Sequence, residues 1–310
     1  MNRTALEIKN LSILFAAVFL WGIHGPAGRY LALEGVSMPF VTVTRFWVGT
    51  CFIFVYLLYT KRFRREFFSF YKSLLPIGLI GIALNSIVYH VGFRFVSATV
   101  AMLLENLAPF FVLALAYFFD GKKPLAKHFY GVLLGFLGLI CVCCGWGGVN
   151  VSGTHVWIGI GLELLAGCTF GYYSWASGRF YDSNRERFAL LGLDRSTLIL
   201  NTLFHVFLIS SIALSPIYAF SWDYPTKPAH FFWIVEMGVF QSGVAYILWN
   251  KAIHHFSSSV TCLFFFLTVF FTIVNEVLFL HFRPNFPILL GCAFILGGVA
   301  VIMVRKSNEK

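Results

Sequence analysis

An acid and an amide stand next to each other inside an apolar part of the chain. Glu105 and Asn106 are flanked by leucine, alanine and phenylalanine, and Pro109 follows four residues after the glutamate. Because proline has no N–H group, the carbonyl oxygen of Glu105 loses its usual partner in a helix. A carboxylate beside a freed carbonyl oxygen could hold an ammonium group or a proton. We therefore predict that Glu105 and Asn106 bind a small molecule.

Two side chains from other segments could complete such a site. Arg45 also lies in an apolar stretch, and it could clamp a carboxylate through two parallel hydrogen bonds or pair with Glu105. His24 lies in the run Gly22-Ile23-His24-Gly25-Pro26, whose glycine and proline predict a break in a helix. A break beside a histidine suits a gate for a substrate, and a kink that serves packing alone is the alternative.

Amides and aromatic rings are spaced to share helical faces. Asn85 and Tyr89 are four residues apart, and Gln241 and Trp249 are eight apart, so each pair lies on one side of its helix. Aromatic rings can hold a cation by a cation–π contact or stack on a flat ring. The predicted binding residues are Trp21, His24, Arg45, Asn85, Tyr89, Glu105, Asn106, Tyr173, Gln241, Trp249 and Phe265.

The elements that position these residues must be unusually apolar. Of the 310 residues, 59% are hydrophobic and 12% are charged, and the mean hydropathy is +0.80. A soluble domain carries about 25% charged residues to cover its surface. The composition therefore argues against a soluble enzyme, a disordered chain and a nucleic-acid-binding protein, and it predicts a polytopic membrane protein.

Ten apolar segments are long enough to cross a bilayer, which takes about 20 residues. They exceed the roughly ten-residue strands of a membrane barrel, so the prediction is an all-α integral membrane protein. The sixth segment carries a second acid, Glu163. The expected spans are about 11–33, 39–60, 73–93, 97–119, 127–146, 156–178, 196–217, 230–250, 257–280 and 286–304.

Basic residues are distributed unevenly between the two sides of these spans. Eighteen of the 23 lysines and arginines fall on the side of the chain ends, three on the other side and two inside spans. Since cytoplasmic loops collect lysine and arginine, both termini are expected in the cytoplasm of a multi-pass cell (inner) membrane protein. The same bias explains the net charge of +10 without a nucleic-acid partner.

The chain contains an internal repeat. A shift of 160 residues aligns 97–138 with 257–298 without a gap, and ten of the 42 positions are identical, including a proline and two glycines at matching places. Each half holds five spans, and an odd number inverts the second half in the membrane. We predict two inverted five-helix repeats, 1–150 and 151–310, with a substrate site near the midplane between them.

Several short motifs together carry a resemblance to a known family. They are Leu20-Trp21-Gly22, Arg45, Ser97-Ala98-Thr99-Val100-Ala101, Pro109, Gly121, Gly131 and Gly138. With them the chain resembles the drug/metabolite transporter superfamily, in its ten-helix EamA-type branch. It departs from the family at Lys122 and Phe282, where glutamates are common, and at Val269, which stands opposite Pro109 in the other repeat. The resemblance implies alternating-access transport of small metabolites without ATP hydrolysis, and the sequence has no GxxxxGK[ST] segment.

These observations predict a secondary transporter for a small zwitterionic or cationic metabolite, such as an amino acid or a derivative. Protons are a candidate coupling ion. One alternative is a transporter of S-adenosylmethionine or of a quaternary amine such as choline. Alternatives of other classes are an integral-membrane enzyme that modifies lipid and a receptor that does not transport.

The expected partners are the metabolite and the lipid bilayer, and the chain is expected as a monomer or a homodimer. No cofactor or metal is predicted, because the seven cysteines lie in apolar runs, and the cluster around Cys143 has no histidine or acid at ligand spacing. No arrangement of residues points to catalysis, so the prediction is a protein that is not an enzyme.

Overall fold

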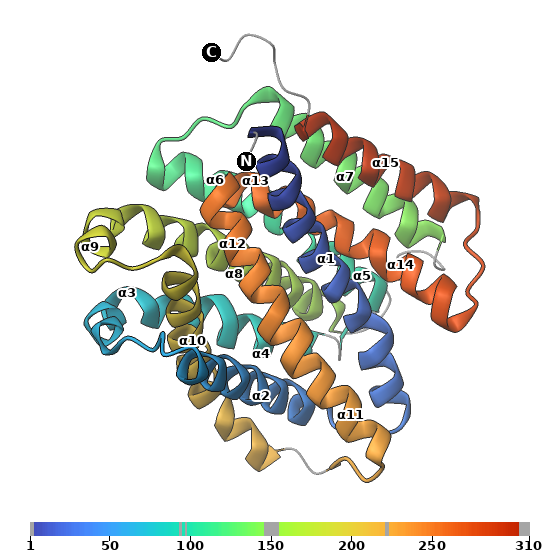
Figure 1. Ribbon diagram of the computed structural model, residues 1–310. Helices are drawn as coiled ribbons and strands as arrows, with labels where there is room; N and C mark the ends of the chain where they lie inside the picture. Colours follow the sequence, from blue (N-terminus) through green and yellow to red (C-terminus); the bar gives the residue numbers. More distant parts are fainter. Residues whose placement is uncertain (1–2, 93–94, 97, 146–154, 221–222, 304–310) are drawn as a thin grey trace.

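The computed structural model describes residues 3–92, 95–96, 98–145, 155–220 and 223–303. Within these residues the regular secondary structure is all helical, with turns and loops between the helices (Figure 1), and ten helices are long and apolar enough to cross a membrane. The all-α membrane fold and the number of spans are therefore confirmed. The α-helices are α1 (Arg3–Leu33), α2 (Met38–Tyr59), α3 (Tyr71–Pro76), α4 (Asn85–Gly92), α5 (Ala98–Glu105), α6 (Ala108–Asp120), α7 (Ala126–Gly145), α8 (Val156–Ser183), α9 (Arg185–Leu190), α10 (Arg195–Leu214), α11 (Pro228–Glu236), α12 (Ala245–Phe256), α13 (Ser258–Leu263), α14 (Leu267–Leu280) and α15 (Phe286–Met303). Shorter 3₁₀ and π segments are η1 (Arg65–Phe70), η2 (Ile77–Leu84), η3 (Ser215–Phe220), η4 (Met237–Val244) and η5 (Phe264–Phe266).

Several spans are longer than the sequence predicts. Among them are Arg65–Gly92, Val156–Ser183 and Pro228–Phe256. Their extra turns are amphipathic: in the first, Phe67 and Phe70 are buried while charged neighbours face outward. Because a hydropathy pattern averages the two sides of a helix, it does not detect such ends.

The outside of the bundle is apolar. Large side chains such as Phe118 and Trp157 are more than three-quarters exposed. In water an apolar surface of this extent would drive association. Covered by lipid it is stable, because the helices satisfy their own backbone hydrogen bonds.

The predicted break in the first helix is wrong, since α1 is continuous and contains Pro26. Proline removes a single backbone hydrogen bond, and the rest of the helix holds. Gly22 allows close packing here: a Cβ atom at this position would lie 2.7 Å from the Cβ atom of Phe271 in α14. The glycine therefore permits a close helix crossing and does not end the helix.

The third and eighth spans contain π-helical segments. The sequence spacing of Asn85 and Tyr89, and of Gln241 and Trp249, assumes a regular α-helix and does not predict them. η2 occupies Ile77–Leu84 and η4 occupies Met237–Val244. A π-helix forms i→i+5 hydrogen bonds and so turns the side chains that follow it, and such segments are frequent at functional sites. The two are separated by the same 160 residues that relate the repeats.

Close helix contacts recur with the same offset. A Cβ atom at Gly138 in α7 would lie 2.6 Å from the carbonyl oxygen of Gly291 in α15. Shifted by 160 residues, this contact becomes that of Gly298 with the carbonyl oxygen of Gly131, at 2.7 Å. α7 and α15 lie side by side in Figure 1. The opposite orientation of the two halves and the boundary between residues 150 and 151 stay predictions.

An even number of spans places both chain ends on one side. We call this side, where α1 begins and α15 ends, the terminal face, and the other side the opposite face. At the terminal face, Asn10 Nδ2 lies 3.0 Å from His255 Nε2, and Arg62 lies 4.0 Å from Asp194. Which face meets the cytoplasm stays a prediction.

At the opposite face, the loop that follows α1 is hydrogen-bonded to the segment before α11. The Ser37 amide donates to the Asp223 carbonyl oxygen at 3.0 Å, and Lys227 donates to the Glu34 carboxylate. That hydrogen bond holds the pKa of Glu34 below its usual value, so the carboxylate is charged at neutral pH.

Candidate functional site

Charged and polar side chains meet in the half of the bundle nearer the opposite face. Tyr89 of α4 is hydrogen-bonded to the Glu105 carboxylate at the end of α5, and the Arg45 guanidinium of α2 interacts electrostatically with it. Arg45 lies seven residues into α2, which is about 10 Å of helix at 1.5 Å per residue. We call Arg45, Tyr89, Glu105, His24 and Gln241 the polar layer.

A chain of hydrogen bonds joins this layer to the second half of the protein. His24 Nδ1 lies 2.7 Å from Gln241 Oε1 and 3.3 Å from Arg45 Nη1. The Gln241 amide nitrogen donates to a Glu236 oxygen at 2.9 Å, which orients the amide. Because the amide oxygen only accepts, Nδ1 of His24 is assigned as the donor to it. The guanidinium of Arg45 also only donates, so its contact with Nδ1 is not a hydrogen bond.

Local sequence explains why Glu105 reaches this place. α5 ends at Glu105 and α6 begins at Ala108, so the helix is interrupted where Pro109 removes a backbone donor. The interrupted segment packs closely against α8. A Cβ atom at Gly167 of α8 would lie 2.7 Å from the Leu104 carbonyl oxygen. The backbone of α2 at Arg45 also packs closely on η4. A Cβ atom at Gly238 would lie 3.0 Å from the backbone carbonyl oxygen of Arg45.

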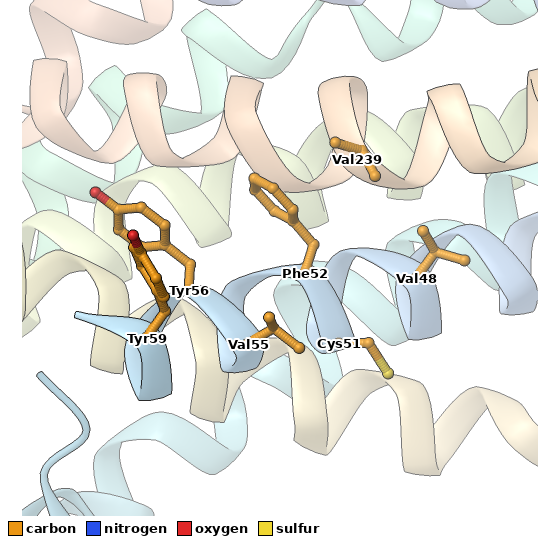
Figure 2. A pocket seen from close by; sticks show the side chains of 7 residues that line it. All are labelled: Val48, Cys51, Phe52, Val55, Tyr56, Tyr59 and Val239. Atoms are coloured by element: carbon orange, nitrogen blue, oxygen red, sulfur yellow. The ribbon is translucent and has the colours of Figure 1, made fainter. Parts of the chain in front are cut away.

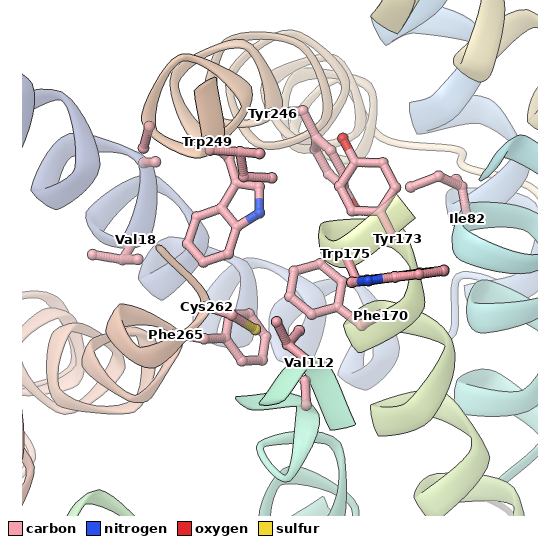
Figure 3. Packing of buried hydrophobic residues seen from close by; sticks show 14 of the residues in the cluster. Val18, Ile82, Val112, Phe170, Tyr173, Trp175, Tyr246, Trp249, Cys262 and Phe265 are labelled. Atoms are coloured by element: carbon pink, nitrogen blue, oxygen red, sulfur yellow. The ribbon is translucent and has the colours of Figure 1, made fainter. Parts of the chain in front are cut away.

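Aromatic side chains close the bundle on the terminal-face side of the polar layer. Trp249 and Tyr173 are fully buried, and Phe265 is 6% exposed. Figure 3 shows them in one group with Phe170 and Tyr246, extending from α12, α8 and η5. The Phe170 and Phe265 ring centroids are 4.5 Å apart. We call Trp21, Phe170, Tyr173, Tyr246, Trp249 and Phe265 the aromatic cluster.

Polar atoms of the aromatic cluster bind to neighbouring side chains. Asn250 Nδ2 donates to the Tyr173 hydroxyl at 2.6 Å, and Trp249 Nε1 donates to Ser174 Oγ at 3.4 Å. Trp21 joins the two groups, because its Nε1 donates to the Gln241 backbone carbonyl at 3.0 Å while its ring packs in the cluster. The aromatic cluster is thus a packed layer on the terminal-face side of the polar layer.

The structure divides the predicted binding residues into three groups. Trp21, His24, Arg45, Tyr89 and Glu105 are partly accessible, and all but Trp21 belong to the polar layer. The buried Gln241 joins them by its hydrogen bonds, whereas Tyr173, Trp249 and Phe265 lie in the aromatic cluster. The remaining two bind helix backbone: Asn85 donates to the Ala166 carbonyl at 2.8 Å and Asn106 to the Met102 carbonyl at 2.9 Å.

Among the neighbours of these residues, the predicted set lacks Phe170, Tyr246 and Glu236. Phe170 and Tyr246 belong to the aromatic cluster, and Glu236 binds Gln241. Glu236 carries a sequence signal, because an acid inside a span is by default functional. Tyr246 stands three residues before Trp249, on the same helical face.

Two apolar grooves lie on the surface of the bundle beside η4. One, of about 380 Å³, lies along α11 and η4 and includes Glu236. The other, of about 430 Å³, opens beside α2 and η4 (Figure 2). Its walls are apolar except for the thiol and two phenols, so lipid chains suit it better than a charged metabolite. It is lined by Val48, Cys51, Phe52, Val55, Tyr56, Tyr59 and Val239.

The chain is similar in sequence to proteins that are named as uncharacterized transporters. It is 22% identical over 220 residues to the uncharacterized transporter YxxF of Bacillus subtilis (strain 168), covering 70% of this chain and 65% of that protein. It is 21% identical over 315 residues to the uncharacterized transporter YvbV of the same strain, covering 100% and 94%. An uncharacterized transporter of Archaeoglobus fulgidus is 23% identical over 135 residues, with 44% and 48% covered.

The fold also resembles a solved structure. A crystal structure aligns with a TM-score of 0.78 and 17% identity, and the match covers 95% of this chain and 96% of that one. The model of the EamA-like transporter family matches residues 9–144 and 190–304. These ranges hold every helix that contributes to the polar layer, whereas α8 lies outside them. The chain therefore belongs to the EamA-like transporter family.

Proposed function

We propose that the protein is a secondary transporter that moves a small zwitterionic or cationic metabolite, such as an amino acid or a derivative, by alternating access. One observation carries the proposal: Arg45 and Glu105 bring opposite charges to one place in the membrane, and both are partly accessible. Charged groups at this depth are costly and are usually kept for substrate or ion pathways.

The polar layer offers complementary groups to a zwitterion. The Glu105 carboxylate would bind the amine, and the Arg45 guanidinium would bind the carboxylate. Among the described residues, the buried Nε of Arg45 has no hydrogen-bond acceptor. A buried donor without an acceptor is unfavourable, and a substrate carboxylate would supply one.

The packing around the polar layer supports a state that is closed toward the terminal face. The aromatic cluster fills that side with rings that are buried except for Trp21, while the polar side chains keep some accessibility. Alternating access then requires the cluster to separate as the opposite face closes. Residues of both halves take part, as expected for a site between two repeats.

The test is thermal unfolding of the purified protein against amino acids, S-adenosylmethionine and choline. A ligand that binds only the folded state stabilises it by about 2.7 kcal/mol at a hundred times its dissociation constant. We expect one class to raise the melting temperature of the wild type and of Glu186→Gln, whose carboxylate is exposed on α9. The shift should disappear in Glu105→Gln.

Each other outcome changes the proposal. A shift by choline and not by amino acids would replace the zwitterion with a quaternary amine. A shift that survives in Glu105→Gln would remove this residue from the site. No shift with any compound, together with no uptake of them into proteoliposomes, would refute the proposed substrate class.

A further inference from the structure

A second carboxyl group lies buried beside the polar layer. Glu163 stands seven residues into α8 and is 0% exposed. Its carboxyl group lies against the α4 backbone, where a Cβ atom at Gly92 would be 2.8 Å from Cδ. Among the described residues, neither of its oxygens has a hydrogen-bond partner and no basic side chain forms an ion pair with it.

This environment disfavours a negative charge. A carboxylate moved from water into an apolar interior loses its hydration, and only hydrogen bonds or a counter-charge can replace it. A protonated carboxyl group avoids the greater part of this loss because it is neutral. The geometry of Glu163 therefore suits the acid form.

Two titratable groups face Glu163 from the helices packed against α8. Glu105 on α5 and Tyr89 on α4 interact with it electrostatically. Two neighbouring carboxyl groups resist ionising together, so the pair keeps one proton between them. Glu105 has the Tyr89 hydroxyl and the Arg45 charge to stabilise its ionised form, and Glu163 has neither.

We infer that Glu163 is a proton-binding site inside the membrane and that its proton is linked to the charge on Glu105. The inference rests on the proposed function in one respect, that Glu105 binds the positively charged group of the substrate. A cation that neutralises Glu105 would make Glu163 easier to ionise, and the released proton would pass to water on the accessible side of Glu105. Substrate binding and proton release are then coupled.

The test is infrared spectroscopy of the purified full chain in H₂O and D₂O over a range of pH. A protonated carboxyl group gives a C=O stretch that is absent from a carboxylate and shifts in D₂O. We expect this band at neutral pH in the wild type and in Glu186→Gln, and its loss in Glu163→Gln. Glu163→Asp is the second variant, for use if Glu163→Gln folds poorly. It keeps an acid at the position and should therefore keep a C=O band.

Glu105→Gln tests the link between the two residues. This variant removes the negative charge of Glu105, as a bound cation would. The C=O band of Glu163 should then disappear at a pH about one unit lower than in the wild type, which is a tenfold change in proton affinity. A wild-type spectrum without the band at neutral pH, or a band unchanged in Glu163→Gln, would overturn the proton site. An unchanged titration in Glu105→Gln would overturn the link. Since no substrate is added, these results do not depend on the ligand panel.

Discussion

Two adjacent glycines of α15 should respond in opposite ways to the same substitution. At Gly298 a Cβ atom would lie 2.7 Å from the carbonyl oxygen of Gly131 and 2.9 Å from the amide nitrogen of Gly135, both in α7. At Gly297 no atom lies within 4 Å. Alanine is therefore expected to be harmful at Gly298 and harmless at Gly297.

The distances set the size of the effect. Ordinary contacts begin at 3.4 Å, so a Cβ atom at 2.7 Å requires α7 and α15 to move apart by about 0.7 Å. Backbone atoms cannot rotate away as a side chain can, and overpacking of this kind costs about 1–3 kcal/mol. At Gly297 the same change should stabilise by about 0.5–1 kcal/mol, because alanine loses less conformational freedom in a helix.

The assay is thermal unfolding of both variants in one detergent, followed by tryptophan fluorescence. Gly298→Ala should melt below the wild type and Gly297→Ala at or above it. Equal melting temperatures for the two variants would refute the close approach of α7 and α15. Since Gly138 and Gly291 make the repeat-related contact, Gly138→Ala should behave as Gly298→Ala does.

Three further predictions concern other parts of the protein. Asp194 caps α10 by accepting from the Ser196 and Thr197 amides, so Asp194→Ala should cost about 0.5–2 kcal/mol in thermal unfolding. Hydrogen bonding from Thr197 holds the pKa of Asp194 below its ordinary value of 3.8. The difference in stability between the wild type and Asp194→Ala should therefore be fully present above about pH 4 and should vanish as the pH falls through the lowered pKa of Asp194. Arg45→Gln should weaken binding of ligands with a carboxylate and spare choline in the thermal shift panel, and equal losses for both would contradict the clamp. Trp249→Ala should destabilise by about 3–5 kcal/mol in the same melts because a fully buried ring is removed, and a loss below about 1 kcal/mol would contradict its packing.

The spans and the family could be predicted because they depend on order along the chain. A helix that crosses lipid must be apolar over its whole length, so ten spans are visible in composition alone. The sequence predicts one span over 97–119, in which Pro109 frees the Glu105 carbonyl. The interruption of the helix between Glu105 and Ala108 is visible only in the structure. The repeat is visible because its offset of 160 residues preserves a proline and two glycines.

Contacts between helices decided what the sequence left open. The local pattern favours a break at Gly22 and Pro26, but α1 is continuous and Gly22 packs on Phe271. Asn85 and Tyr89 share a spacing that predicts one face, yet Asn85 binds the Ala166 carbonyl and Tyr89 binds Glu105. A side chain takes the partner that its neighbours offer, and spacing along one helix does not contain those neighbours.

The sequence by itself determined that this is a ten-span membrane protein with acids, an arginine and many rings inside it. The tertiary structure alone decided that Arg45 and Glu105 lie in one polar layer, that Trp249 and Tyr173 pack on its terminal-face side, and that Glu163 is buried without a partner in the part of the chain described. The physical reason is that hydropathy belongs to a residue, whereas burial, pairing and charge depend on distances between residues far apart in the chain.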